Sequence, residues 1–153
     1  MKANELKIGD WVLYDKQPHK VRKLGIYGAN HDGSDYPAIC VGKPNGVGLI
    51  LEINDIEPIP LTPEILKKID LKIGNVTEYL GYDIYSDEEG TFGVSEDHEG
   101  FVFETYKRWE EKDCDGAPID WGFYPVNRIK GIRYFHELQH ALRLCGIDKE
   151  IIL

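Results

Sequence analysis

Short apolar stretches separated by turn residues occupy the first sixty positions of the chain. They cover residues 11–14, 19–27, 37–42, 47–53 and 56–60, and they are rich in β-branched and aromatic residues. Asn45-Gly46, between the third and the fourth stretch, is typical of the tight turn of a β-hairpin. Pro58 and Pro60 restrict the last stretch to the edge of a sheet. The pattern therefore predicts five short strands.

The number and length of these strands indicate a fold class. Five short strands are too few for a β-sandwich and suit a small SH3-like β-barrel. The segment Ile8-Gly9-Asp10-Trp11-Val12 also resembles the first strand of such barrels. We therefore expect residues 1–60 to form an SH3-like barrel.

After residue 60 the pattern changes to that of a helix followed by further strands. Thr62 suits the N-cap of this helix, Pro63 its first position and Glu64 its first turn. The stretches 79–85, 90–95, 101–109 and 121–126 have the pattern of three or four antiparallel strands, and the polar residues 110–120 are expected to form a loop.

The clearest helical pattern lies at residues 134–145. Its apolar side consists of Phe135, Leu138, Ala141, Leu142 and Cys145. Gly146 predicts a left-handed cap, with the following residue folded back onto the last turn. Residues 61–153 are thus expected to form an acidic α+β domain, in which an antiparallel sheet packs with two helices.

The last helix contains one motif that suggests chemistry. His136-Glu137-Leu138-Gln139-His140 matches the H-E-x-x-H pattern of zinc hydrolases, in which two histidines bind Zn²⁺ and the glutamate polarises a water. At about 100° per residue, His136 and His140 lie opposite the apolar side, so we expect both to face solvent. The extended pattern requires Gly and His where the chain has Arg143 and Gly146. Two solvated histidines are therefore the favoured interpretation, and we expect no metal and no cofactor.

A second string resembles the beginning of a calcium-binding loop. Residues 111–116 (EKDCDG) have acids at alternate positions followed by glycine. The bidentate glutamate that closes such a loop is replaced by Gly122, which favours an acidic turn.

Three aromatic residues are candidates for a binding groove. Trp11, Tyr27 and Tyr36 fall within or beside the predicted strands of the barrel, where aromatic patches bind peptides in SH3-like domains. The alternative is that they form the core and rim of the barrel.

The charge of the chain is unevenly distributed. The net charge is −9, and residues 83–120 contain thirteen acidic residues against three basic ones. Such a region repels phosphate backbones and disfavours nucleic-acid binding there. It is compatible with a solubilising surface, with a docking surface for a basic partner, or with mimicry of DNA.

The cysteines and the apolar segments predict the compartment. Cys40, Cys114 and Cys145 form neither a disulfide framework nor a zinc knuckle. No apolar run has the roughly 20 residues that span a bilayer, and residues 1–11 lack the apolar core of a signal peptide. We therefore expect a cytoplasmic protein without a membrane partner.

Three segments together resemble one protein family. Residues 3–12 (ANELKIGDWV), 56–66 (IEPIPLTPEIL) and 134–142 (YFHELQHAL) resemble "ELRIGNWV", "PIPLT.E.L" and "YVHxLQxL" in small proteins encoded by prophages and mobile elements of gut bacteria. The family pattern keeps His136, Leu138 and Gln139 but does not require Glu137 or His140. The resemblance therefore implies a packing role for this helix, and it supplies no activity.

These observations leave three hypotheses about function. The first is a non-enzymatic interaction module of phage or mobile-element origin, which binds another protein. The second is a zinc-dependent hydrolase that uses His136, Glu137 and His140. The third is an acidic DNA mimic of the anti-restriction type, acting through residues 83–120.

Overall fold

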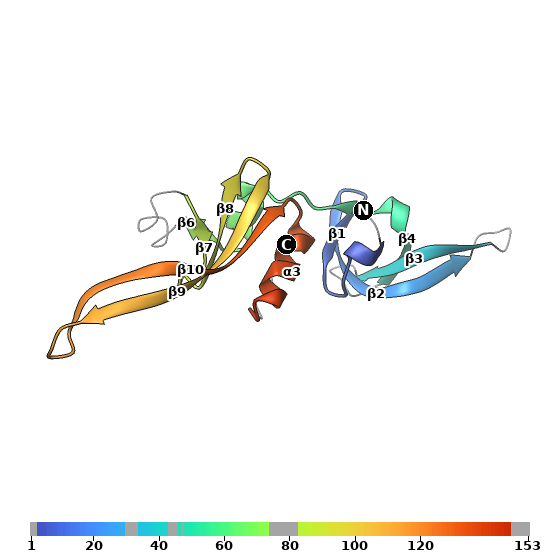
Figure 1. The fold of residues 1–153 in the computed structure, drawn as a ribbon. Helices are drawn as coiled ribbons and strands as arrows, with labels where there is room; N and C mark the ends of the chain where they lie inside the picture. Colours follow the sequence, from blue (N-terminus) through green and yellow to red (C-terminus); the bar gives the residue numbers. More distant parts are fainter. Residues whose placement is uncertain (1–2, 30–33, 43–45, 47, 74–82, 148–153) are drawn as a thin grey trace. The chain divides into compact units, whose positions relative to one another are not determined.

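The computed structural model describes residues 3–29, 34–42, 46, 48–73 and 83–147 (Figure 1). The chain divides into two compact units. Unit 1 consists of Met1–Pro60 with Tyr134–Gln139, and unit 2 consists of Leu61–Arg133 with His140–Leu153. The division therefore falls within the last helix, whose first residues belong with the N-terminal sheet. Among the described residues, no helix is both long and apolar enough to cross a bilayer.

Unit 1 is built on an antiparallel sheet of five strands in the order β4-β3-β2-β1-β5. The strands are β1 (Trp11–Tyr14), β2 (Gln17–Ala29), β3 (Asp35–Gly42), β4 (Gly48–Glu52) and β5 (Glu57–Pro58), with short 3₁₀ helices at Ala3–Glu5 and Ile53–Asp55. Asp15 and Lys16 have φ angles of 50° and 59°, as the two central residues of a type I′ turn require. This turn joins β1 directly to β2.

One apolar cluster forms the core of unit 1. Alternate residues of the strands point inward, and the buried set is Leu6, Val12, Val21, Ile39, Val41, Leu51, Ile53 and Ile56. β5 lies at one edge of the sheet, as its prolines predict, and β4 lies at the other. Within the described residues no pairing joins these two edges, so the sheet is open rather than a closed barrel.

Unit 2 contains a second antiparallel sheet of five strands, in the order β10-β9-β8-β7-β6. Its elements are α1 (Pro63–Lys68), β6 (Lys72–Ile73), β7 (Tyr85–Ser86), β8 (Phe92–Asp97), β9 (Gly100–Lys112) and β10 (Pro118–Ile132), and α3 (Phe135–Leu144) begins in unit 1 and ends in unit 2. The α+β class with antiparallel sheets is confirmed.

Both predicted helix ends have the expected geometry. Thr62 Oγ1 accepts a hydrogen bond from Ile65 N–H at 3.3 Å, and Pro63 occupies the first helical position. Gly146 has a φ of +72°, and the N–H of the next residue, Ile147, donates to Leu142 O at 2.9 Å. The Schellman cap predicted from the glycine is therefore confirmed.

The prediction of a loop at residues 110–120 is wrong. β9 continues to Lys112 and β10 begins at Pro118, so that only the turn between them is irregular. Both faces of this part of the hairpin are largely exposed, and a strand without a buried face lacks the alternation of apolar and polar residues that marks a strand. The short β6 was not predicted, and most of the strand expected at 79–85 lies outside the described residues.

Candidate functional site

The zinc-protease motif lies in the first two turns of α3. The N–H of Tyr134 donates to Glu137 Oε2 at 3.1 Å. This is the reciprocal half of a capping box, in which an acid three positions into the helix satisfies a backbone donor at its start. Glu137 therefore caps the N-terminal end of α3, which is a structural role.

The expectation that His136 faces solvent is wrong. His136 is only 3% exposed, and its ring stacks on that of Tyr134 with a centroid distance of 5.8 Å and an interplanar angle of 7°. His140 is partly buried. The apolar stripe in the sequence predicts only which side of a helix is buried. At the start of α3 the opposite, polar side is buried as well, including His136 and Gln139.

Gln139 holds the N-terminal turn of unit 1. Its Oε1 accepts from Trp11 N–H at 3.2 Å, and its Nε2 donates to Gly9 O at 3.3 Å. The same turn is closed by Asp10, which is fully buried and whose Oδ2 accepts from Lys7 N–H at 2.7 Å. The side-chain amide thus satisfies two backbone groups 128 and 130 positions away in the chain.

The start of α3 is also bonded to the segment that follows β5. Phe135 N–H donates to Ile59 O at 2.9 Å, and an isolated antiparallel bridge pairs Pro60 with Tyr134. The three segments on which the family resemblance rests therefore meet in one place. This arrangement explains the motif by packing, whereas the resemblance itself remains a prediction.

The two histidines of the motif have no third metal ligand beside them in the described part of the chain. No group of three His, Cys, Asp or Glu side chains is placed there to hold a metal ion.

The calcium-like string, residues 111–116, forms the turn of the β9–β10 hairpin. Asp113 Oδ1 accepts from the N–H groups of Asp115 and Ala117 at 3.0 and 2.8 Å. Among the thiols, burial raises the pKa of Cys145, which disfavours its reactive thiolate form.

The aromatic residues proposed for the rim of unit 1 are differently placed. Trp11 is buried, and its backbone is held by Gln139. Tyr36 is partly buried on β3, and the side chain of Tyr27 lies outside what the structure describes. A groove formed by all three thus remains a prediction, and Trp11 belongs to the packed part of the unit.

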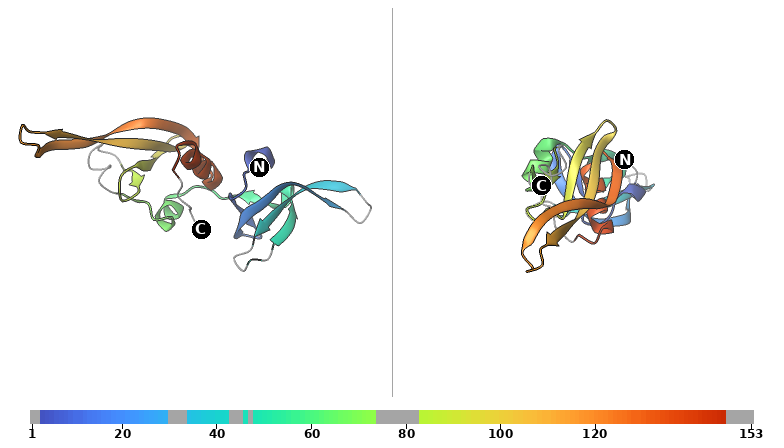
Figure 2. Two further views of the ribbon diagram at one scale, coloured as in Figure 1. Left: turned by 90° about the horizontal axis from the view of Figure 1, so that it is seen from below. Right: turned by 60° about the vertical axis from the view of Figure 1, so that its left-hand side comes forward.

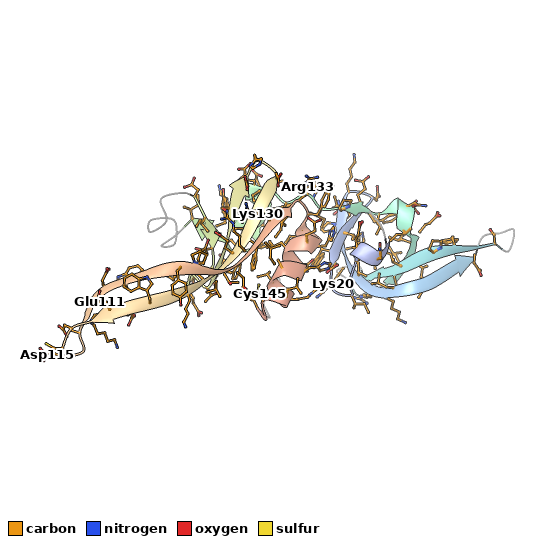
Figure 3. The ribbon with its side chains drawn as sticks, viewed as in Figure 1. Lys20, Glu111, Asp115, Lys130, Arg133 and Cys145 are labelled. Atoms are coloured by element: carbon orange, nitrogen blue, oxygen red, sulfur yellow. The ribbon has the colours of Figure 1, made fainter. Side chains whose placement is uncertain are left out.

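The feature that sequence reasoning missed is a two-stranded arm in unit 2. We define the arm as residues 107–124, the part of the β9–β10 hairpin beyond the point where β8 pairs with β9 (Figures 1 and 2). In the described residues, this part of β9 pairs only with β10. Glu111 and Asp115 lie at its far end, whereas Lys130 lies near the other end of β10, close to Arg133 (Figure 3).

The arm is anchored at its base by a small aromatic cluster. Tyr106 and Phe123 are buried together with Ile84. They lie over Gly93, where an added Cβ would come within 2.3 Å of Ile84 and 3.1 Å of Tyr106. Tyr106 O–H also donates to the buried Glu104 at 2.8 Å. An isolated hairpin is marginally stable in water, so this cluster is what fixes the direction of the arm.

Apolar side chains are exposed along the arm and just beyond it. Trp121, Tyr124 and Val126 are 45%, 44% and 55% exposed. The guanidinium of Arg108 lies 5.3 Å from the centre of the Trp121 ring, a cation–π contact that holds the indole in place. The aromatic residues Trp121 and Tyr124 are visible in the sequence, but no periodicity showed that they would be exposed.

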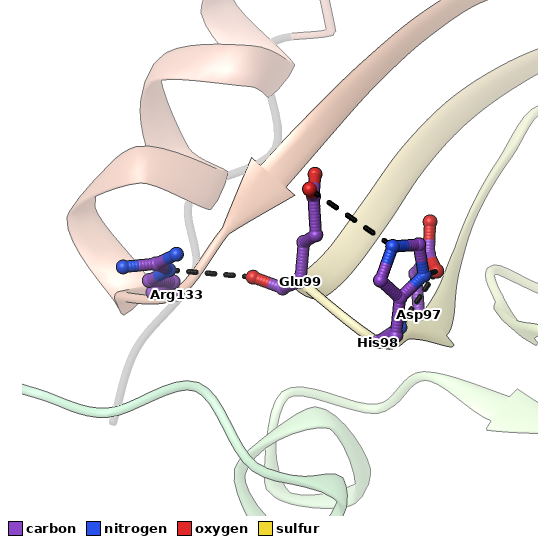
Figure 4. A network of polar contacts seen from close by, with 4 residues as sticks. All are labelled: Asp97, His98, Glu99 and Arg133. Atoms are coloured by element: carbon purple, nitrogen blue, oxygen red, sulfur yellow. Dashed lines mark hydrogen bonds and ion pairs between the residues drawn. The ribbon is translucent and has the colours of Figure 1, made fainter.

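The turn between β8 and β9 carries a polar network of a different kind (Figure 4). His98 N–H donates to Asp97 Oδ1 at 2.6 Å, and Arg133 Nε–H donates to Glu99 O at 3.3 Å. The hydrogen bond from the backbone of His98 lowers the pKa of Asp97 below its ordinary value. The His98 ring is largely exposed, so these contacts order a turn and leave no enclosed site.

No protein-family model matches the chain, and no match was found among curated proteins or among solved structures. Function is therefore inferred from the residues of the arm and of the α3 region alone.

Proposed function

We propose that the chain is a protein-binding module and that the arm is its binding element. The observation that carries this proposal is the exposure of Trp121 and Tyr124, which lie on opposite faces of the arm, and of Val126 just beyond them. Folded proteins seldom leave such a group uncovered, and tryptophan and tyrosine are enriched where proteins bind one another. The cation–π contact with Arg108 also fixes the Trp121 ring before binding, which reduces the entropy lost on association.

The partner that fits this surface is a basic protein. The turn of the arm and the adjoining end of β10 carry Asp113, Asp115 and Asp120, all exposed. They belong to the acidic region between residues 83 and 120, which would repel a nucleic acid and attract a cationic protein surface. Mimicry of DNA is the special case in which that cationic surface normally binds DNA.

Unit 1 would act as the carrier of this element. Its five short strands around one core are compatible with an SH3-like fold, and a phage or mobile-element origin fits the resemblance of its terminal segments. Both are part of the proposal. The zinc-hydrolase alternative has no comparable support, because Glu137 caps α3 and His136 is stacked and buried.

Affinity capture with matched variants tests the proposal. Tagged wild-type protein, Trp121→Ala/Tyr124→Ala and Ile50→Ala are used to capture proteins from lysate of the host cell, followed by quantitative mass spectrometry. Ile50 is the control because it is an apolar residue on β4 of unit 1 that is even more exposed, at 62%. We expect a basic protein that is captured by the wild type and the control and is lost with the double variant. Equal capture by all three would contradict the proposal.

A further inference from the structure

Among the described residues, no strand covers the outer edge of β9 in the arm. β8 begins at Phe92, which pairs with Thr105, and no described strand continues beside β9 beyond that point. The open edge consists of Lys107-Arg108-Trp109-Glu110-Glu111 and contains no proline. An edge of this kind presents unpaired backbone donors and acceptors.

The hydrogen bonds at the base of the arm show which residues point toward this edge. Tyr106 N–H donates to Thr91 O at 2.8 Å, so its backbone groups point away from β10. Antiparallel strands alternate between residues that bond to the neighbour and residues that point away. Because β9 and β10 pair one-to-one from Tyr106 to Glu111, Arg108 and Glu110 also point their N–H and C=O groups toward the open edge.

The opposite edge of the hairpin is different. Pro125 faces Tyr106 in the register, so its nitrogen, which has no proton, points outward from β10. Proline in this position prevents a further strand from pairing there. Strand addition along β10 is therefore interrupted at the base of the arm, whereas the β9 edge contains no proline.

The charges along the open edge of one copy complement those of a second, antiparallel copy. Two cations precede Trp109 and two anions follow it, and Arg108 and Glu110 form an ion pair at 2.8 Å within the strand. Two copies of the strand in antiparallel orientation can exchange this pair for pairs between the copies. We propose that two copies of the chain associate through this edge, with Trp109 opposite Trp109, Arg108 opposite Glu110 and Lys107 opposite Glu111. The hydrogen-bonding alternation permits this register, because it pairs the outward-pointing Arg108 with the outward-pointing Glu110.

Charge also selects this register over its neighbours. A symmetric pair centred on Arg108 would set two arginines opposite each other, and one centred on Glu110 would set two glutamates opposite each other. Charged residues protect an edge strand from pairing when like charges meet, and only the register centred on Trp109 avoids this. Trp109 faces Gly122 across the hairpin, so no β10 side chain lies directly opposite its ring.

The association can fail without failure of the proposed function, because it uses the backbone edge of β9, whereas partner binding uses exposed side chains of the turn and of β10. Arg108 contributes to both, since it also holds the Trp121 ring. It would make the module divalent, with two arms joined in a four-stranded ribbon. Five paired residues per copy form a small interface compared with the roughly 800 Å² per partner of standard complexes. We therefore expect a dimer whose population depends on protein concentration.

Charge reversal tests the association and its register. Sedimentation velocity over a range of concentrations compares the wild type with Lys107→Glu/Arg108→Glu, Glu110→Lys/Glu111→Lys and the control Glu88→Lys/Glu89→Lys. The control makes the same charge change as Glu110→Lys/Glu111→Lys, but in an exposed turn. We expect the wild type and the control to dimerise, each edge variant alone to remain monomeric, and an equimolar mixture of the two edge variants to form heterodimers. Circular dichroism verifies that each variant is folded.

The mixture distinguishes loss of the interface from loss of the fold, because only correctly folded edges can restore the pairing. A wild type that stays monomeric at all concentrations would overturn the proposal. So would edge variants that dimerise individually, or a mixture that remains monomeric.

A cysteine pair provides an independent measurement of the register. At the centre of the proposed pair the Cα atoms would be about 4.5 Å apart, within the range of about 4.4–6.8 Å that a disulfide spans. In a Cys114→Ser background, oxidised Trp109→Cys is expected to migrate as a covalent dimer on a non-reducing gel. Glu110→Cys, whose counterparts would be about 7–8 Å apart on the diagonal, is expected to remain monomeric. The reverse result would exclude this register.

Discussion

The start of α3 and the arm make opposite use of polar and apolar residues. At the start of α3, His136 and Gln139 are buried, and Gln139 and Glu137 satisfy backbone groups. In the arm, Trp121 and Tyr124 are exposed although burial would be favourable for both. The region whose motif suggests catalysis is thus a packing junction, and the region without a motif presents the surface suited to binding.

The difference between the two regions shows how a binding site can be distinguished from residues that only stabilise the fold. A buried polar group with a partner is explained by the fold that it stabilises. An exposed apolar group on an otherwise ordered strand is not explained by the fold, because its removal costs the chain little. The following predictions test this contrast by changing one residue at a time.

The largest effect is expected from truncating a ring in the buried region. Phe135→Ala removes a fully buried side chain and should lower the free energy of unfolding by about 3–5 kcal/mol. Trp121→Ala removes a larger side chain from the arm but should cost only about 1–2 kcal/mol, from the cation–π contact with Arg108 and the edge-to-face contact with Phe123. Urea unfolding measures both values, and equal losses would break the comparison.

The next effect concerns the amide that joins the two ends of unit 1. Gln139→Leu keeps the size of the side chain but leaves Trp11 N–H and Gly9 O without their partner. Leaving the buried Trp11 N–H without this bond costs about 1–3 kcal/mol, and the partly buried Gly9 O adds less, so we expect a loss of about 2 kcal/mol. A change within about 0.5 kcal/mol in urea unfolding would show that these two bonds do not hold the turn.

A smaller effect separates capping from catalysis at Glu137. Glu137→Ala should lower stability by about 1 kcal/mol, the usual cost of losing a helix cap, whereas Glu137→Gln should retain most of it because glutamine also serves in a capping box. The measurement is thermal unfolding of both variants, with metal analysis of the purified wild type. Stoichiometric zinc that is lost in His140→Ala would support the hydrolase instead.

The smallest effect is expected at an exposed polar turn. The hydrogen bond from the backbone N–H of His98 lowers the pKa of Asp97 in the folded state. The ionised Asp97 therefore stabilises the fold above its unfolded pKa of about 3.9, and this stabilisation is lost as the pH falls through the folded pKa. Asp97→Asn should make stability slightly less sensitive to pH below about 4. Urea unfolding at pH values from about 2.5 to about 7, a range that includes this pKa, measures the free energy of unfolding of the wild type and of the variant. A steeper acid dependence in the variant would contradict this cause.

Local chemistry made parts of this structure predictable from the sequence. Thr62 and Gly146 carry capping signals that act within a few residues, and both caps are observed. The burial of His136 was not predictable in this way, because it depends on packing at the start of α3, where Gln139 reaches back to Gly9 and Trp11. Periodicity describes one helix in isolation and cannot show that its polar side is also covered.

The arm was missed for the opposite reason. Residues 110–120 are polar because they are solvated on both faces, and polarity alone indicates a loop as readily as a ribbon. What extends the strands is the cross-strand pairing of Glu110 with Trp121 and Glu111 with Asp120, which depends on residues at the two ends of the segment. The candidate binding residues could be named from the sequence as aromatic, but their exposure could not.

Partner binding and stability measured on one variant test the central claim most directly. Trp121→Ala is unfolded in urea, and its affinity for the captured basic protein is measured by titration calorimetry beside the wild type. The account predicts a free energy of unfolding within about 2 kcal/mol of the wild type and an affinity reduced by at least about tenfold. Loss of stability with unchanged affinity would contradict it and would assign Trp121 to the core of unit 2.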